Sequence, residues 1–161
     1  MSSSKPGDEV ARALAAVVRY TRPGVRSIQE VLMYLRRRGC SPETAARVIA
    51  QGRARGILDD RACARLCAEH WARAGYAWSA IRLKLSAKGL DEPTIEETAT
   101  YVDAAFGDEA RARLVVTSSL RRHMRQPARL ARTLASRGFD PDLIERVLRE
   151  SFGPIPSDAE R

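Results

Sequence analysis

The sequence has little of several residue types, and each shortage narrows the choice of fold. Aromatic residues make up only 6% of the 161 residues, which suits helices packed through small side chains better than a β-sandwich. The longest wholly apolar run covers residues 13–18, whereas a membrane-spanning helix needs roughly 20 apolar residues. No stretch alternates polar and apolar strand-forming residues, so no sheet is predicted.

Cysteines are also few and odd in number, namely Cys40, Cys63 and Cys67. The first nine residues contain no apolar stretch and include Asp8 and Glu9, so we expect no signal peptide. An odd cysteine count without a secretion signal favours reduced thiols over a disulfide scaffold. These features predict a cytoplasmic protein that does not associate with membranes.

Lysine is almost missing, since 3 Lys stand against 25 Arg, and the formal net charge is +8. Arginine suits the recognition of phosphate and carboxylate groups. A preference for arginine codons would explain the Arg/Lys ratio equally well, but not the net charge. Residues 1–58 carry +7, residues 59–107 carry −2 and residues 108–161 carry +3. This balance favours nucleic acid or an acidic protein surface as the partner.

Catalytic and metal-binding patterns are lacking as well. The sequence contains no glycine-rich phosphate loop, nucleophile elbow or HExxH motif. Cys63, Cys67 and His70 share a helix face and are candidate soft metal ligands, but buried small side chains are the simpler interpretation. Asp59 and Asp60 precede a helix, where capping is a simpler role than acid–base catalysis. We therefore predict no catalytic residue, no metal and no cofactor.

A repeat of about fifty residues is what the sequence does contain. Three glycines lie 50 and 49 residues apart, each follows a basic residue, and a leucine stands four positions before each glycine. The leucines face one side of a helix, the basic residue meets the negative end of the helix dipole, and glycine ends the helix in the left-handed conformation. The glycines are Gly39, Gly89 and Gly138, the basic residues Arg38, Lys88 and Arg137, and the leucines Leu35, Leu85 and Leu134.

Helix caps recur with the same period. Two residues after the glycines stand Ser41, Asp91 and Asp140, which are preferred N-cap residues. Ser27 followed by Glu30 is a capping box for the preceding helix. Acidic residues, among them Asp60, begin a third helix in each unit.

These signals predict an all-α protein of three tandem three-helix repeats that form an elongated, curved stack, because fifty-residue units bury little surface alone. The expected divisions are a disordered N-terminus (1–8), repeats at 9–58, 59–107 and 108–152, and a loose C-terminal tail (153–161). The helices are expected near 9–20, 28–38, 42–54, 61–74, 79–88, 93–105, 109–124, 128–137 and 141–151.

Basic side chains gather at two places and form the candidate partner-binding set together with Lys88 and Arg137. A solvated helix face is the plainer alternative. Arginine serves both phosphates and acidic side chains, so the pattern leaves the two kinds of partner open. The clusters are Arg36, Arg37 and Arg38, and Arg121, Arg122, Arg125, Arg129 and Arg132.

Four segments together resemble the RecX family. Residues 26–39 resemble its Arg-Ser opening and Leu-x-x-basic-Gly ending, and residues 56–60 resemble its Gly-hydrophobic-hydrophobic-Asp-Asp signature. Residues 85–90 and 134–139 resemble its central Leu-x-x-Lys-Gly-Ile and closing Leu-x-x-Arg-Gly-Phe motifs. The likeness covers about residues 10–150. Cys63 and Thr133 stand where the family tends to have aromatic residues, which concerns packing.

The resemblance implies tandem three-helix repeats and a modulator of the RecA recombinase that is not an enzyme. Such proteins bind in the groove of the RecA–DNA filament and inhibit ATP hydrolysis, strand exchange and coprotease activity, in homologous recombination, DNA repair and the SOS response. We expect a monomer whose partner is the RecA filament. The residues also allow an alternative, a DNA-binding helical-repeat protein that acts through phosphate contacts. Weak non-specific DNA binding would be compatible with both.

Overall fold

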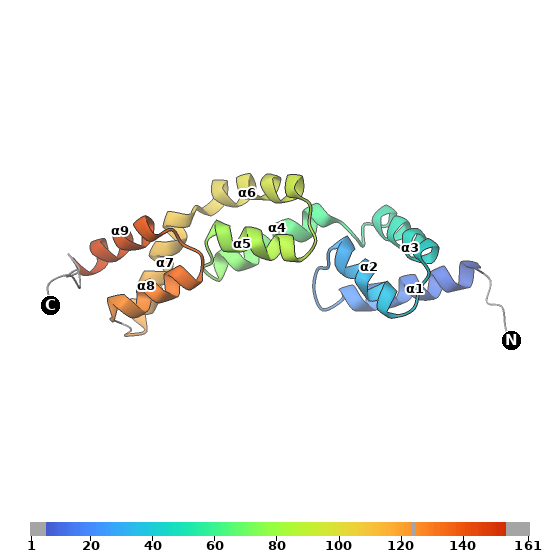
Figure 1. The fold of residues 1–161 in the computed structure, drawn as a ribbon, viewed down its shortest axis with the longest axis horizontal. Coiled ribbons are helices and arrows are strands. Elements are labelled where there is room, and N and C mark those ends of the chain that lie inside the picture. Colours follow the sequence, from blue (N-terminus) through green and yellow to red (C-terminus); the bar gives the residue numbers. More distant parts are fainter. Residues whose placement is uncertain (1–5, 124, 154–161) are drawn as a thin grey trace. The chain divides into compact units, whose positions relative to one another are not determined.

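A computed structural model describes residues 6–123 and 125–153, and within these residues the chain forms nine helices and no strand (Figure 1). The predicted all-α class is therefore confirmed. The helices are α1 (Pro6–Thr21), α2 (Ile28–Arg37), α3 (Pro42–Ala54), α4 (Asp60–Arg73), α5 (Trp78–Ala87), α6 (Glu92–Phe106), α7 (Asp108–Arg121), α8 (Pro127–Ser136) and α9 (Pro141–Phe152).

Two helix ends differ from the expectation by three residues, and the others differ by one residue at most. Helix α1 begins at Pro6, so residues 6–8 form its first turn instead of belonging to a disordered N-terminus. Proline at the first helical position and the acidic Asp8 and Glu9 in the first turn favour this earlier start. Helix α7 ends at Arg121 instead of 124, and His123 beyond it has a φ of 61°. The rest of the predicted terminal segments, residues 1–5 and 154–161, lies outside the described residues.

The chain divides into two compact units. The N-terminal unit comprises residues 1–67 and 85–98, and the C-terminal unit comprises residues 68–84 and 99–161. Helices α4, α5 and α6 contribute residues to both units, as expected when a middle repeat contacts a neighbour on each side. The three repeat boundaries and the elongated, curved stack stay predictions.

The core of the N-terminal unit forms where α1, α2 and α3 meet (Figure 1). Helix α3 packs against both α1 and α2. Val17, Val31, Leu35 and Val48 are completely buried there. Val31 and Leu35 lie four residues apart on α2, which is why one face of this helix enters the core.

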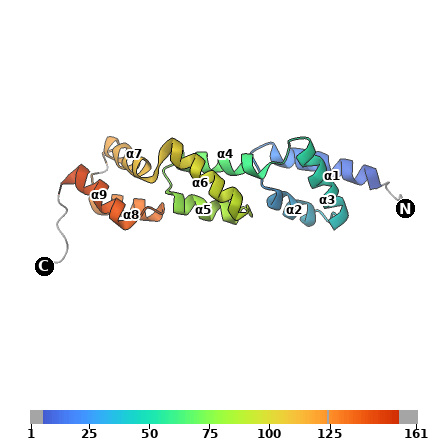
Figure 2. The same ribbon diagram turned by 90° about the horizontal axis from the view of Figure 1, so that it is seen from above.

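The core of the C-terminal unit is built in the same way by α7, α8 and α9 (Figure 2). Leu130 and Leu134 of α8 are completely buried, as are the equivalent Val31 and Leu35 of α2. Val116 of α7 joins them in the core with 1% exposure. The leucine that precedes each glycine by four residues is thus a core residue in both units.

A set of hydrogen bonds joins distant segments inside the N-terminal unit. The Ser27 hydroxyl donates to the carbonyl oxygen of Lys88. The backbone N–H of Ile28, the first residue of α2, donates to Asp60 Oδ1 at 2.8 Å. The start of α2 is therefore fastened to the end of α5 and to the first residue of α4.

The C-terminal unit repeats this arrangement about fifty residues later. The Ser79 hydroxyl donates to the Gly138 carbonyl, and the N–H of Trp78 donates to Asp108 Oδ1 at 2.8 Å. The start of α5 is therefore fastened to the end of α8 and to the first residue of α7. The recurrence of the N–H to aspartate bond supports a repeated structural unit, because the first residues of α2 and α5 bond to the first residues of α4 and α7 in the same way.

The caps explain one surprise at Asp60. Asp59 Oδ1 accepts from the N–H groups of Arg61 and Ala62, so Asp59 caps α4. Asp60 instead caps α2, as described above. The first carboxylate of α4 therefore serves a helix that begins 32 residues earlier, which a local cap signal does not predict.

The other predicted caps act on their own helices. Ser27 and Glu30 form a reciprocal capping box at the start of α2. Ser41, Asp91 and Asp140 accept from backbone N–H groups at the starts of α3, α6 and α9.

The three repeat glycines all have positive φ angles, which are 76° at Gly39, 75° at Gly89 and 85° at Gly138. Two of them also touch another segment. A Cβ atom at Gly89 would lie 2.5 Å from Gln29 Cγ, and one at Gly138 would lie 2.9 Å from Ala80 Cβ. At these two positions glycine both ends a helix and lets the next segment approach closely.

Candidate partner-binding surfaces

The arginine cluster of the N-terminal unit lies at the end of α2. Arg36 and Arg37 form its last turn and Arg38 is its C-cap, and all three side chains are exposed. Among the described residues, Arg36 and Arg37 have no acidic partner. They are therefore available to an external anion.

Arg38 takes part in a stack of arginine and tyrosine side chains, which the sequence pattern did not predict. Its guanidinium lies 5.6 Å from the centroid of the Tyr34 ring. Tyr34 stacks on Tyr20 with 4.2 Å between ring centroids, and Arg26 lies 4.9 Å over Tyr20. Each cation–π contact contributes about 0.5–1 kcal/mol at such partly exposed sites. The stack joins α2 to the end of α1 and orients Arg38.

The arginine cluster of the C-terminal unit lies where α7 ends and α8 begins. Arg121 ends α7, Arg122 is its C-cap, Arg125 follows, and Arg129 and Arg132 lie on α8. All five are exposed, and none has an acidic partner within residues 6–123 and 125–153.

Other arginines of the same unit are paired. Arg113 lies 2.7 Å from Glu109 and 3.0 Å from Glu150, and Arg146 lies 3.5 Å from Glu109. The unit thus compensates the charges along α7 and α9 but leaves the corner between α7 and α8 uncompensated. A concentration of like charge of this kind attracts an anionic partner.

Lys88 and Arg137, the two remaining candidates, occupy a different environment. The Lys88 Nζ atom lies 2.7 Å from Glu30 Oε2, and the side chains of Lys88 and Glu30 are only 16% and 24% exposed. Arg137 is half-buried and donates from Nη1 to the Ala74 carbonyl at 3.0 Å. Both hold the ends of α5 and α8 in place, so their role in partner binding stays a prediction.

Electrostatics make the Glu30–Lys88 pair a defined ionic contact. Burial by itself would raise the pKa of Glu30, but hydrogen bonds from Lys88 and from the Ser27 N–H, with the charge of Lys88, hold this pKa below its usual value. Burial would likewise lower the pKa of Lys88, but the hydrogen bond to Glu30 outweighs burial and raises this pKa. Both groups are therefore charged at neutral pH.

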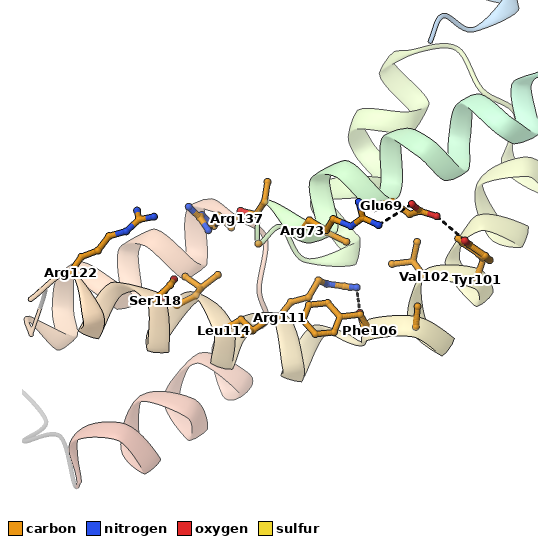
Figure 3. Close-up of a pocket in the computed structure, with 15 residues that line it drawn as sticks. Glu69, Arg73, Tyr101, Val102, Phe106, Arg111, Leu114, Ser118, Arg122 and Arg137 are labelled. Atoms are coloured by element: carbon orange, nitrogen blue, oxygen red, sulfur yellow. Dashed lines mark hydrogen bonds and ion pairs between the residues drawn. The ribbon is translucent and has the colours of Figure 1, made fainter. Parts of the chain in front are cut away.

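The C-terminal unit also contains a groove of about 820 Å³ (Figure 3), which the sequence did not reveal. The ends of α4 and α6, the length of α7 and the end of α8 line it. Its apolar lining includes Val102, Phe106 and Val115. Leu114 and Tyr101 also line it, although 54% and 45% of their surfaces are exposed.

Four arginines and one glutamate line the groove. The glutamate, Glu69, accepts from the Tyr101 hydroxyl at 2.7 Å and pairs with Arg73 at 3.5 Å. Arg111 is completely buried, and it donates to the Phe106 carbonyl and to Asp108, while its Nε has no partner among the described atoms. Burial of an arginine is uncommon, so the sequence pattern did not predict that Arg111 is buried.

Two of the cysteines, Cys63 and Cys67, interact with each other through their thiol groups. Within residues 6–123 and 125–153, no three His, Cys, Asp or Glu side chains gather as metal ligands would. Cys63 is buried and Cys67 is half-buried. A hydrogen bond from Cys63 lowers the pKa of Cys67 to about 7, because it stabilises the thiolate.

None of the helices in the described part of the chain has the length and apolar character to cross a membrane.

The sequence of this chain is similar to those of several known proteins. No protein-family model matches the chain. The regulatory proteins RecX of Mycobacterium ulcerans and Mycobacterium marinum are each 32% identical to it over 155 residues, which cover 91% of this chain and 88% of theirs. Regulatory protein RecX of Lactobacillus johnsonii is 30% identical over 151 residues, or 89% of this chain, but the chain spans only 55% of that protein's length.

Solved structures agree on the fold. The crystal structure of RecX from Lactobacillus salivarius matches with a TM-score of 0.70 at 18% identity, over 89% of this chain and 97% of that one. A second crystal structure of a regulatory protein RecX matches with a TM-score of 0.69 at 20% identity, over 88% and 72%. Identities this low show the fold alone. The identity and coverage shared with the mycobacterial relatives show that the chain belongs to the RecX family.

Proposed function

We propose that this chain is a non-catalytic, cytoplasmic regulator of homologous recombination and DNA repair. It binds the RecA–DNA filament and inhibits the ATPase, strand-exchange and coprotease activities of RecA. Membership of the RecX family supports RecA as the partner. The structural observation that carries the proposal is the group of five exposed arginines at the corner of α7 and α8, which the unit leaves without acidic partners.

The mechanism requires binding only. A RecA–DNA filament presents acidic side chains and phosphates, and guanidinium groups pair with both. Two arginine clusters on one chain raise the total affinity, because the second contact becomes intramolecular after the first. A ligand stabilises the filament state that it contacts best, so binding would slow the subunit rearrangements that ATP turnover requires.

The test measures RecA-catalysed, single-strand-dependent ATP hydrolysis at substoichiometric concentrations of this chain. The wild-type chain should reduce the rate. Replacing Arg121, Arg122 and Arg125 by Glu should weaken inhibition and leave helicity intact, because all three side chains are exposed.

A charge-matched control separates the surface from the net charge. Replacing Arg47, Arg53 and Arg55 by Glu makes the same charge change on exposed side chains in the middle and at the end of α3. This variant should inhibit nearly as well as the wild type. Full inhibition by the first variant, or an equal loss of inhibition in both variants, would exclude the α7–α8 corner as the binding surface. No inhibition by the wild-type chain would exclude the proposed function.

Direct DNA binding is the second candidate, because the same unpaired arginines suit phosphates. It predicts tight binding to oligonucleotides without recombinase, with a log–log salt slope of about −0.9 per phosphate contact on duplex DNA. Fluorescence anisotropy with and without RecA distinguishes the candidates. An affinity that rises strongly when the filament is present supports RecA as the partner, and an unchanged affinity supports DNA alone.

A further inference from the structure

The groove of the C-terminal unit has an apolar floor, formed by the buried Val102 and Val115, and an exposed apolar side chain, Leu114. Leu114 of α7 has 54% of its surface exposed, and it lines the groove together with the buried Val102 and Val115. Tyr101 lies at the α6 side, with 45% of its surface exposed. Concave apolar surfaces with a few polar groups are where partners bury an anchoring side chain. The volume of about 820 Å³ has room for several side chains of a peptide.

The charges around this floor are predominantly positive. Arg111 is neutralised by Asp108, and Arg73 shares Glu69 with the Tyr101 hydroxyl. Arg122 has no acidic partner in the described chain, and Arg137 has only a carbonyl and an aromatic ring. The uncompensated charge of the groove therefore comes from Arg122 and Arg137, both of which are in its lining.

The part of the groove lining around Gly75, just after α4, is held in a fixed position. Gly75 has a φ of 83°, and a Cβ atom there would lie 2.6 Å from both Arg137 Nη1 and Val115 Cγ2. Because Gly75 lacks a side chain, Arg137 can reach the end of α4 and bond to Ala74. A groove held in this way loses little conformational entropy on binding.

We propose that this groove binds an acidic peptide segment of a protein partner. A large apolar side chain of the segment packs on Leu114, and its carboxylates pair with Arg122 and Arg137. A nucleic acid strand would satisfy the two arginines but leave the apolar floor uncovered. The inference rests on the proposed function, since it names the surface of this chain that receives a segment of the recombinase.

Photo-crosslinking tests the site directly. Benzoylphenylalanine replaces Leu114 in one variant and Leu83 in another, because Leu83 is 72% exposed and lies outside the groove lining. Each variant is mixed with RecA assembled on poly(dT) with a slowly hydrolysed ATP analogue. Cosedimentation first shows whether the chain binds the filament, and mass spectrometry then identifies the crosslinked peptides.

The expected result is a crosslink from position 114 to a RecA peptide rich in Asp and Glu with a large apolar residue, and none from position 83. Crosslinks to poly(dT), to a basic RecA peptide, or at equal yield from both positions would overturn the inference while leaving the proposed function intact. A chain that does not cosediment would overturn both.

Affinities provide a second measurement. Leu114→Ser and Arg122→Glu should each weaken filament binding about tenfold, and Leu83→Ser should leave it unchanged. Circular dichroism checks the fold, which should persist because all three side chains are exposed. Unchanged affinity for both groove variants would contradict the inference.

Discussion

Lys88 offers the sharpest test of how the N-terminal unit holds together. Replacing it by methionine keeps most of the side-chain volume but removes the ammonium that lies 2.7 Å from Glu30. The Glu30 carboxylate would then lose its main counter-charge in a site where its side chain is only 24% exposed. Lys88 and Glu30 stand 58 residues apart in sequence, so the pair links two separate segments.

The magnitude follows from the degree of burial. An exposed pair contributes about 0–1 kcal/mol, and removing one partner of a fully buried pair costs about 3–5 kcal/mol. The burial of Lys88 and Glu30 is intermediate between these cases, and the change does not touch the Ser27 N–H, which donates to Glu30 Oε2 at 2.8 Å. We therefore expect a loss of about 2 kcal/mol in the free energy of unfolding. The melting temperature should fall by on the order of 4–8 °C.

The assay is urea and thermal unfolding followed by circular dichroism. Arg61→Met is the matched control, since Arg61 pairs with Glu97 at 3.3 Å in the same unit but is 71% exposed. We expect this variant to lose less than about 0.5 kcal/mol. Equal losses in the two variants would refute the reasoning from burial.

The pH dependence adds an independent check. The pKa of Glu30 lies below its usual 4.5 in the folded chain, so the stabilisation is present above pH 4.5 and is lost as the pH falls through the folded value. The pKa of Lys88 lies above its usual 10.5, so its stabilisation is present below pH 10.5 and is lost as the pH rises through the folded value. The difference between wild type and Lys88→Met should be constant from about pH 4.5 to 10.5 and shrink outside. A difference that persists undiminished at pH 2 would contradict the ionic origin.

Two further predictions concern local contacts. Gly89→Ala should destabilise the chain by at least about 1 kcal/mol more than Gly39→Ala in urea unfolding, because both glycines have positive φ but only Gly89 has a neighbour where the new Cβ would lie. Equal losses would show that the backbone angle alone decides the cost. Cys63→Ala should raise the pKa of Cys67 from about 7, because the hydrogen bond that stabilises the thiolate is lost. The rate of Cys67 alkylation at pH 7, followed by mass spectrometry, should therefore fall, and an unchanged pH–rate profile would contradict this assignment.

The sequence determined the helices because their signals are local. A glycine with positive φ after a leucine and a basic residue, and a Ser or Asp two positions later, act within one or two helical turns. The core residues Leu35 and Leu134 followed from helical spacing for the same reason. The predicted helix ends therefore differ from the observed ones by one residue at most positions and by three at the start of α1 and the end of α7.

The tertiary structure alone decided which distant groups meet. Asp60 caps α2 instead of its own helix, Lys88 meets Glu30, and Arg111 is buried against Asp108 and the end of α6. The arginines at the α7–α8 corner are visible in the sequence, but their lack of acidic partners depends on where the glutamates of α7 and α9 lie. The groove likewise required four helices, α4, α6, α7 and α8, to converge. Charge and spacing are written along the chain, whereas pairing and enclosure depend on contacts between residues far apart in it.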